Sequence, residues 1–177
     1  AAFLTRAMRL ARRHLLLLAG LAGVRARAQS SSEAVVKARL VLNLLRFTQW
    51  PAASGDARLL GVAVRSESQR DAFAELEGQN VAGKPLHVVL NPATLPAGCR
   101  ALYVEADAER SAAALLAAAT ALPVLTVGDG DGFIGRGMVG LVNVNDAIRF
   151  EVNLARLRAN QLSLPSQVLR LAQTVRE

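Results

Sequence analysis

The sequence predicts a single α/β domain, with a largely parallel wound sheet covered by helices, an antiparallel edge hairpin and a C-terminal helix. Two observations carry this prediction. Short apolar runs alternate with helical patterns over much of the chain, which is typical of a parallel sheet with both faces covered. After residue 138, apolar and polar residues alternate on either side of a turn-rich cluster, which is typical of a β-hairpin.

The first 28 residues have the layout of a secretory signal peptide. A basic start with four arginines is followed by the apolar run Leu15–Val24 and by an A-x-A cleavage signal that ends at Ala28. The run is too short to cross a bilayer, which needs about 20 residues. We therefore expect export, cleavage between Ala28 and Gln29, and one domain over residues 29–177. A short uncleaved membrane anchor is the alternative.

The positive charge of the chain lies mostly in this first segment. The whole chain has 21 basic and 14 acidic residues, but residues 1–28 contain six arginines and no acidic residue. Residues 29–177 therefore hold 21 − 6 = 15 basic and 14 acidic residues, a net charge of +1. This part has no basic stripe and few aromatic residues, so we expect no nucleic-acid binding.

The first element of the domain is a helix from Glu33 to Gln49, which Pro51 ends. It is apolar except for a narrow polar stripe of Arg39, Asn43 and Arg46. A helix this apolar is packed on two sides or against another chain.

Four strands and two helices then alternate along the chain. The strands are expected at Arg58–Val64, Pro85–Leu90, Ala101–Glu105 and Val124–Val127. The first of the two helices begins with a capping box of Ser66 and Gln69 and turns Ala72, Phe73 and Leu76 inward. The second runs from Ala108 to about Ala121 and has Asp107 as its cap.

Residues 127–137, VGDGDGFIGRG, contain a formal match to the G-x-G-x-x-G pattern of dinucleotide-binding proteins. In those proteins the glycines open a helix, whereas here β-prone residues follow and then the alternation of residues 148–153. We therefore expect a flexible surface loop that leads into the hairpin, and no cofactor. Phe133 is either an anchor that packs back onto the domain or an exposed contact. A last helix begins near Ser163–Pro165 and presents Leu164, Val168, Leu171 and Val175 on one face.

Residues that could carry catalysis or bind a metal are scarce after residue 28. His87 lies mid-strand among apolar neighbours, which predicts a buried core histidine. Cys99 has no intrachain partner, so it is either a small buried apolar residue or paired between chains. Arg149, Glu151 and Asn153 share one face of a strand, which is either an ordinary solvated face or a recognition surface.

The chain resembles the YfiR-like family of periplasmic signalling proteins from about Ala34 to Ala172. The segments that carry the resemblance are Phe47–Pro51, Gly83–Pro85, Cys99–Tyr103, Pro123–Asp129 with Phe133, Gly137–Val139, Arg149–Leu154 and Leu169–Ala172. The chain departs from the family pattern at Gln49, where an acid is frequent, and at Arg136, where glycine is frequent. Some members have structural disulfides, which one cysteine cannot form within this chain.

The resemblance implies a periplasmic, non-enzymatic repressor. Such a protein binds the periplasmic sensor part of an inner-membrane diguanylate cyclase or another membrane sensor and lowers cyclic di-GMP output. An outer-membrane lipoprotein can sequester it, and family members can form homodimers. The candidate partner-binding residues are Arg39, Arg46, Trp50, Phe133, Arg149, Glu151 and Asn153. The alternative is a periplasmic small-ligand binding module whose site lies at the carboxyl ends of the parallel strands, near Ser66, Asn91, Asp107 and Asp129.

Overall fold

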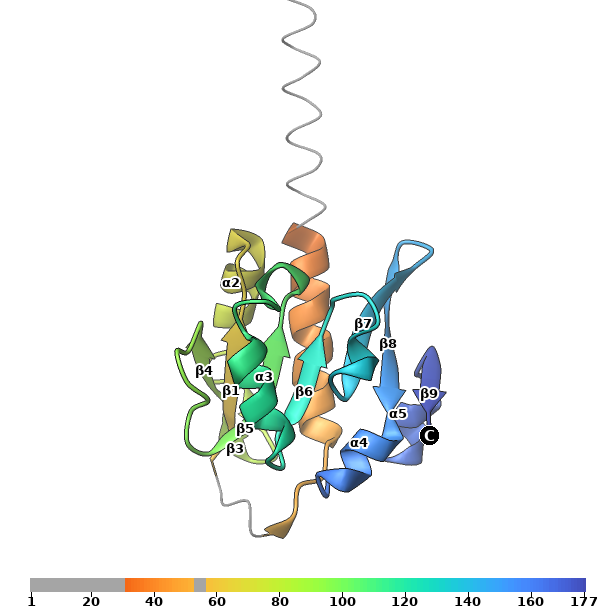
Figure 1. Cartoon of the computed structure of the whole chain (residues 1–177). Coiled ribbons are helices and arrows are strands. Elements are labelled where there is room, and N and C mark those ends of the chain that lie inside the picture. The colour runs from red at the N-terminus through yellow and green to blue at the C-terminus, as the bar shows by residue number, and fades with distance from the viewer. Residues whose placement is uncertain (1–30, 53–56) are drawn as a thin grey trace, which may run out of the picture.

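A seven-stranded sheet forms the centre of the molecule in the computed structural model, which describes residues 31–52 and 57–177 (Figure 1). The predicted signal peptide, residues 1–28, and the cleavage point between Ala28 and Gln29 lie outside the described residues. The strand order is β4-β1-β5-β6-β7-β8-β9. These strands are β1 (Leu59–Ala63), β4 (His87–Leu90), β5 (Cys99–Val104), β6 (Leu125–Gly128), β7 (Val139–Val144), β8 (Ala147–Asn153) and β9 (Thr174–Arg176).

The five strands from β4 to β7 run parallel, which confirms the predicted α/β fold. Each of the four strands expected from apolar runs is present, with ends within two residues of the expected ones. All six residues of β5 are buried, because helices cover both faces of the sheet at its centre. A small separate hairpin of β2 (Asn80–Val81) and β3 (Lys84–Pro85) precedes β4 and was not expected.

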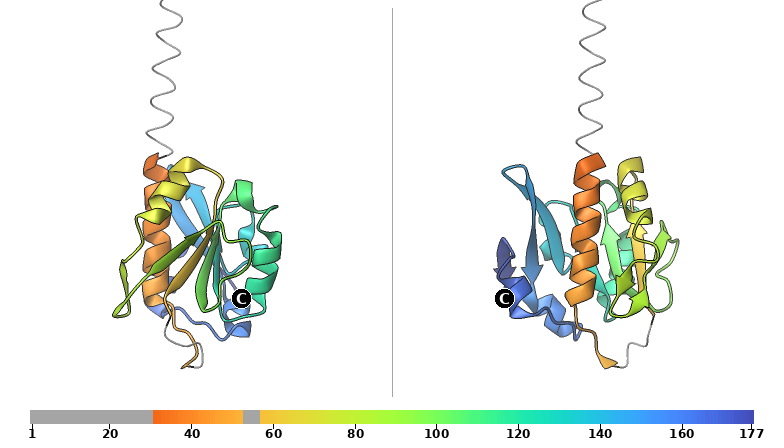
Figure 2. Two further views of the ribbon diagram at one scale, coloured as in Figure 1. Left: turned by 90° about the vertical axis from the view of Figure 1, so that its left-hand side faces the viewer. Right: turned by 180° about the vertical axis from the view of Figure 1, so that it is seen from behind.

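Helices lie on both faces of the sheet and make a three-layered domain (Figure 2). The N-terminal helix (residues 31–47) and α2 (Glu67–Ala74) cover one face and share a core with it, whereas α3 (Ala113–Thr120) covers the other face. The inward positions Ala72, Phe73 and Leu76 are buried as predicted.

The N-terminal helix has the amphipathic pattern that the sequence predicts. Val41, Leu44 and Leu45 are almost fully buried, whereas Arg39, Asn43 and Arg46 are exposed on one stripe. The helix ends two residues before the predicted Gln49, and the Thr48 hydroxyl donates a hydrogen bond to the Leu44 carbonyl at this end.

The predicted starts of two helices are wrong in detail. Ser66 is the N-cap residue of α2, but its side chain makes no cap hydrogen bond, so the capping box with Gln69 does not form. Both side chains instead bond to carboxylates that are distant in sequence. Asp107 lies in the 3-10 helix η2 (Ala106–Ala108), and α3 begins later, with Ala112 in the N-cap position. The early residues of the expected helix are therefore turns.

The predicted hairpin is confirmed as β7 and β8, which pair from Val139↔Val152 to Val144↔Ala147. Its turn is formed by Asn145 and Asp146, whose φ angles of 51° and 60° fit the two-residue turns that join twisted strands.

The hairpin is not the edge of the sheet, because β9 pairs with β8 in parallel. The C-terminal helix is also shorter than expected. After α4 (Leu154–Ala159), α5 covers only Ser166–Leu169, and Val175 lies in β9 rather than on a helix face. Leu164 and Val168 are buried as expected, whereas Leu171 is 71% exposed.

Candidate functional site

A cluster of polar side chains lies at the carboxyl ends of the parallel strands, around Asp129. Asp129 Oδ2 accepts hydrogen bonds from Lys37 Nζ at 2.7 Å, from the Tyr103 hydroxyl at 2.9 Å and from Gln69 Nε2 at 3.1 Å. Asp129 Oδ1 accepts from the backbone N–H of Ala106 at 2.6 Å. The side chains of Asp129 and Lys37 are only 5% and 13% exposed. This Asp129 cluster therefore ties the N-terminal helix to α2, β5 and the loop after β6.

The charges of the cluster are fixed by their surroundings. Burial opposes the charged form of Lys37, but the hydrogen bonds and negative charges of Asp129 and Glu33 outweigh it and raise the Lys37 pKa above its ordinary value. Burial, together with the Asp129 carboxylate, raises the pKa of Tyr103 well above its ordinary value. Lys37 is thus a stable cation and Tyr103 a neutral donor at every physiological pH.

Two more side chains at this end of the sheet bond to backbone groups of a neighbouring strand-to-helix connection. The Glu105 carboxylate, which follows β5, accepts from the backbone N–H groups of Arg65 and Ser66 and from the Ser66 hydroxyl. Asn91, which follows β4, accepts from the backbone N–H of Val64 at 2.8 Å. Asp129 and Ala106 follow the same scheme. A side chain after one strand therefore satisfies the amides that follow the adjacent strand.

These hydrogen bonds affect the small-ligand site that the sequence predicts, as an alternative, at the carboxyl ends of the parallel strands. The strand order changes direction between β1 and β5, and open α/β sheets usually bind ligands outside the carboxyl ends at such a point. Here the Glu105 carboxylate occupies the amides that an anionic ligand would use, and Ser66, Asn91 and Asp129 are all engaged within the protein. Within residues 31–52 and 57–177, no group of three His, Cys, Asp or Glu residues could hold a metal ion.

The exposed face of the N-terminal helix is the second feature of interest. Besides Arg39, Asn43 and Arg46 it presents Val36 and Phe47, which are 45% and 52% exposed. We call these five residues the outer face. Arg46 is partly held, because its Nε donates to the Asn80 carbonyl at 3.0 Å. The sequence predicted the arginines of this surface, and the structure adds two large apolar side chains to them.

The three polar residues of β8 do not belong to the outer face. Phe150 and Val152 pack into the core that contains the N-terminal helix, so Arg149, Glu151 and Asn153 point to the opposite side of the sheet. Arg149 is exposed and Glu151 half-buried. Asn153 is buried and caps α4, because its Oδ1 accepts from the Arg156 backbone N–H at 3.0 Å. The predicted polar row is therefore reduced to Arg149 and Glu151.

Phe133 is an internal anchor, and its interpretation as an exposed contact is wrong for this structure. The side chain is 1% exposed and belongs to the core on the α3 face of the sheet. The Phe133 ring can pack here because residues 128 and 137 are glycines. A Cβ would lie 2.4 Å from a ring carbon at position 128 and 2.1 Å from one at position 137, which is too close. The glycine stretch contains the short 3-10 helix η3 (Phe133–Gly135) and is followed by β7, so the α-helix that a dinucleotide loop requires does not begin there.

Trp50, Cys99 and His87 differ in how far they are buried. Trp50 is half-buried, and its Nε1 donates to the Arg100 carbonyl at 3.2 Å. Cys99 is buried as the first interpretation required, and burial raises the pKa of its thiol. His87 is exposed on the edge strand β4 and contacts Glu77 at 3.0 Å, so its prediction as a core histidine is wrong. Its neighbours Val88 and Leu90 pack against the core from the opposite face of β4, whereas His87 lies at the exposed start of this edge strand.

Sequence reasoning placed polar groups at the carboxyl ends but missed most of the Asp129 cluster. Lys37 lies in a helix that is otherwise largely apolar, and no pattern there predicts its bond to Asp129. The sequence around Gln69 predicts a local helix cap, whereas its side chain bonds to Asp129. Tyr103 lies within the strand expected at Ala101–Glu105, where no local pattern predicts a partner for its hydroxyl. One signal was available for Glu105 and Asp129, because each is an acid that directly follows a buried strand.

The chain is thus an α/β domain with two main features. The polar groups at the carboxyl ends of its strands form hydrogen bonds within the protein, and its N-terminal helix exposes a mixed apolar and basic face. The chain belongs to the YfiR/HmsC-like family, whose model matches residues 34–173. Members of this family are regulators rather than enzymes, and the family indicates a periplasmic regulator of cyclic di-GMP signalling with a membrane-associated signalling partner. No curated protein matches the chain. Among the described helices, none combines the length and apolarity that crossing a bilayer requires.

Proposed function

We propose that this protein binds the periplasmic part of an inner-membrane diguanylate cyclase, or of a related membrane sensor, and represses it. The outer face of the N-terminal helix is the observation that carries the proposal, because family membership gives the class of partner but no surface. Cleavage after Ala28, release by an outer-membrane lipoprotein and homodimer formation belong to the same proposal.

The outer face has the composition of a protein interface. Aromatic residues and arginine are enriched in interfaces, and here Phe47 lies directly beside Arg46 and one helical turn from Asn43. Because the side chain of Phe47 is about half exposed, completing its burial would contribute roughly 1 kcal/mol to binding. The exposed arginines would set the orientation of the partner through its acidic groups.

Repression requires that the protein bind the inactive state of the sensor more tightly than the active state. A sensor that is half active when free becomes about 1% active when bound if this preference is about 100-fold. Equal affinity for both states would give binding without repression.

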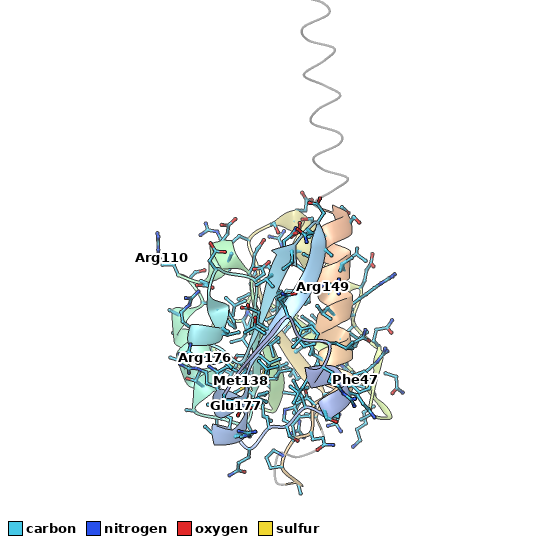
Figure 3. The ribbon with its side chains drawn as sticks, turned by 90° about the vertical axis from the view of Figure 1, so that its right-hand side faces the viewer. Phe47, Arg110, Met138, Arg149, Arg176 and Glu177 are labelled. Carbon is cyan, nitrogen blue, oxygen red and sulfur yellow. The ribbon has the colours of Figure 1, made fainter. Side chains whose placement is uncertain are left out.

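A photo-crosslinking experiment tests the surface. A benzophenone side chain replaces Asn43 in the middle of the outer face, and as a control it replaces Arg110, which is exposed on a different side of the molecule from Phe47 (Figure 3). Expressed in cells, the variant at Asn43 is expected to crosslink to an inner-membrane protein with a periplasmic sensor and a cyclase domain. Equal capture of that protein from both positions would contradict the assignment of the outer face.

Cyclic di-GMP measurement then tests repression. Phe47→Asp should raise the cellular cyclic di-GMP level toward that of a strain lacking the protein, whereas Leu171→Asp, which changes another exposed apolar side chain, should not. An unchanged level in the deletion strain would count against repression itself.

A further inference from the structure

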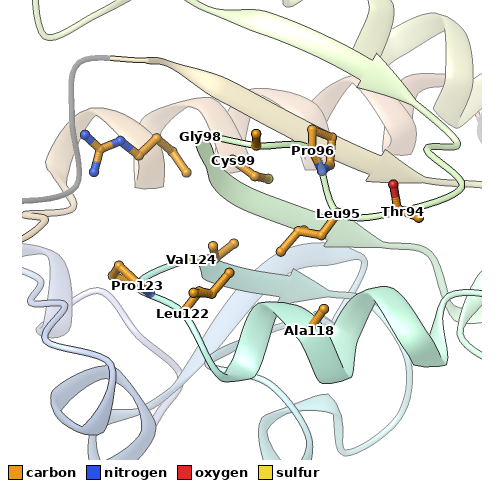
Figure 4. Close-up of a pocket in the computed structure, with 11 residues that line it drawn as sticks. Thr94, Leu95, Pro96, Gly98, Cys99, Ala118, Leu122, Pro123 and Val124 are labelled. Carbon is orange, nitrogen blue, oxygen red and sulfur yellow. The ribbon is translucent and has the colours of Figure 1, made fainter.

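We propose that a pocket at the amino ends of β5 and β6 binds a small, uncharged, largely apolar molecule. The pocket lies between the loop that precedes β5 and the connection from α3 to β6, and its volume is about 490 Å³ (Figure 4). This volume is within the range of small-molecule sites, about 300–1,000 Å³. The inference stands apart from the proposed repression and uses none of the outer-face residues.

The walls of the pocket are apolar. Leu95 comes from the loop before β5, and Leu122 and Val124 face it from the other side, with Ala118 of α3 beside them (Figure 4). Leu122 is 49% exposed, whereas most large apolar side chains of the described residues are buried or half-buried. A bound apolar molecule would remove this surface from water, whereas water gains few hydrogen bonds from such walls.

Backbone hydrogen bonds on both sides of the pocket favour walls that are ordered before any ligand binds. On one side the Cys99 backbone N–H donates to the Pro96 carbonyl at 3.1 Å, and between them Gly98 adopts a φ of +75° that other residues rarely take. On the other side the Val124 N–H donates to the Leu122 carbonyl at 2.7 Å. Walls that are already ordered reduce the entropy that a ligand must overcome on binding.

The charge of the lining decides the class of ligand. Among the lining residues, which all belong to the described part of the chain, Arg100 alone carries a charge. Its Nε donates to the Ala57 carbonyl at 3.1 Å, and its Cζ lies 5.5 Å from the centre of the Trp50 ring. The guanidinium thus already has two partners, Ala57 and Trp50, that do not line the pocket. A cation would meet the like charge of Arg100. An anion would lose its hydration against apolar walls and would compete with the Ala57 carbonyl and the Trp50 ring for this guanidinium, so the site favours neutral molecules.

Fluorescence titration of residues 29–177 with the neutral probe N-phenyl-1-naphthylamine tests the site. Ala118→Trp puts an indole into the pocket, and Ala117→Trp is the matched control, because Ala117 is its exposed neighbour on α3 and does not line the pocket. We expect saturable 1:1 binding to the unchanged protein and to Ala117→Trp, and at least tenfold weaker binding to Ala118→Trp. Circular dichroism and thermal unfolding establish that both variants are folded.

The anionic probe 8-anilinonaphthalene-1-sulfonate tests the charge preference and should bind more weakly than the neutral probe. Absence of saturable binding of the neutral probe, or equal binding by both tryptophan variants, would overturn the site. Tighter binding of the anionic probe that is lost in Ala118→Trp would overturn the choice of a neutral ligand. In either case crosslinking from Asn43 is unaffected, so failure of the pocket and failure of the proposed repression are distinguishable.

Discussion

Replacing Lys37 by methionine tests the view that the Asp129 cluster holds the N-terminal helix on the sheet. Methionine keeps the length and helix propensity of lysine but removes the ammonium group that lies 2.7 Å from Asp129 Oδ2. The carboxylate, whose side chain is 5% exposed, then keeps only neutral donors.

The magnitude follows from the burial of the pair. Removing one partner of a buried ion pair typically costs about 3–5 kcal/mol. Asp129 still accepts hydrogen bonds from Tyr103, Gln69 and the Ala106 N–H, which reduces this cost. We therefore expect Lys37→Met to lower the free energy of unfolding by about 2–3 kcal/mol. Because m is roughly 1–3 kcal/mol per M of urea for small proteins, this loss should lower the urea midpoint by about 1–2 M. The variant should still fold, since domains of this size are stable by roughly 5–15 kcal/mol.

Urea unfolding of residues 29–177 can be followed by the fluorescence of Trp50, the single tryptophan of the chain. The matching variants are Asp129→Asn and the double variant Lys37→Met/Asp129→Asn. The double variant is uncharged at this position, so it should be more stable than the sum of the two single effects predicts, by about 1 kcal/mol or more. Additive effects, or a cost of Lys37→Met below about 0.5 kcal/mol, would refute the reasoning.

The pH dependence supplies an independent check. The folded-state pKa of Lys37 lies above its ordinary value of 10.5, so the stability it contributes is full below that value and is lost as the pH rises through the folded-state pKa. The raised pKa of Tyr103, whose ordinary value is 10.0, acts in the same direction. Unchanged protein should therefore lose stability steeply above about pH 10, and Lys37→Met should lose less over the same range.

Phe133→Ala should lower the free energy of unfolding by about 3–5 kcal/mol, because the fully buried ring leaves a cavity; a change below about 1 kcal/mol in urea unfolding would contradict its role as an anchor. Glu77→Ala should speed hydrogen exchange at the backbone amide of Val88, which donates to Glu77 Oε2 at 2.7 Å on the edge strand; NMR exchange rates that do not change would show that this contact is not formed in solution. Cys99 should react with a disulfide reagent much more slowly in native protein than in urea, because burial raises its thiol pKa; equal rates would contradict its burial.

The parallel part of the sheet could be predicted because its strands are marked locally. Buried strands such as β5 appear in the sequence as short apolar runs between turn residues, and the β7–β8 hairpin as alternation around Asn145 and Asp146. In contrast, β9 has three exposed residues and is defined by its pairing with β8, which no local pattern indicates. The C-terminal helix was overestimated for the same reason, because the chain after Leu169 follows the sheet edge.

The candidate site was predicted only in part, because its contacts join residues far apart in the chain. Lys37 and Asp129 are separated by 92 positions, and nothing near either residue predicts the other. Gln69 fitted a local capping pattern, yet the buried carboxylate of Asp129 offered its amide a stronger, charge-assisted bond. The stripe of Arg39 and Arg46 was predicted correctly, because helical periodicity alone determines which side chains share a face.

The capping scheme at the carboxyl ends also explains why both proposed binding surfaces lie elsewhere. In many wound sheets the amides after the strands stay free for an anionic ligand, but here Glu105 and Asp129 supply the negative charge from within the chain. A ligand that used these amides would have to displace a buried carboxylate that already has several donors. We therefore propose partner contact at the outer face of the N-terminal helix, which the Asp129 cluster holds in place through Lys37. We propose small-molecule binding in the apolar pocket that Leu122 lines, at the opposite end of the strands.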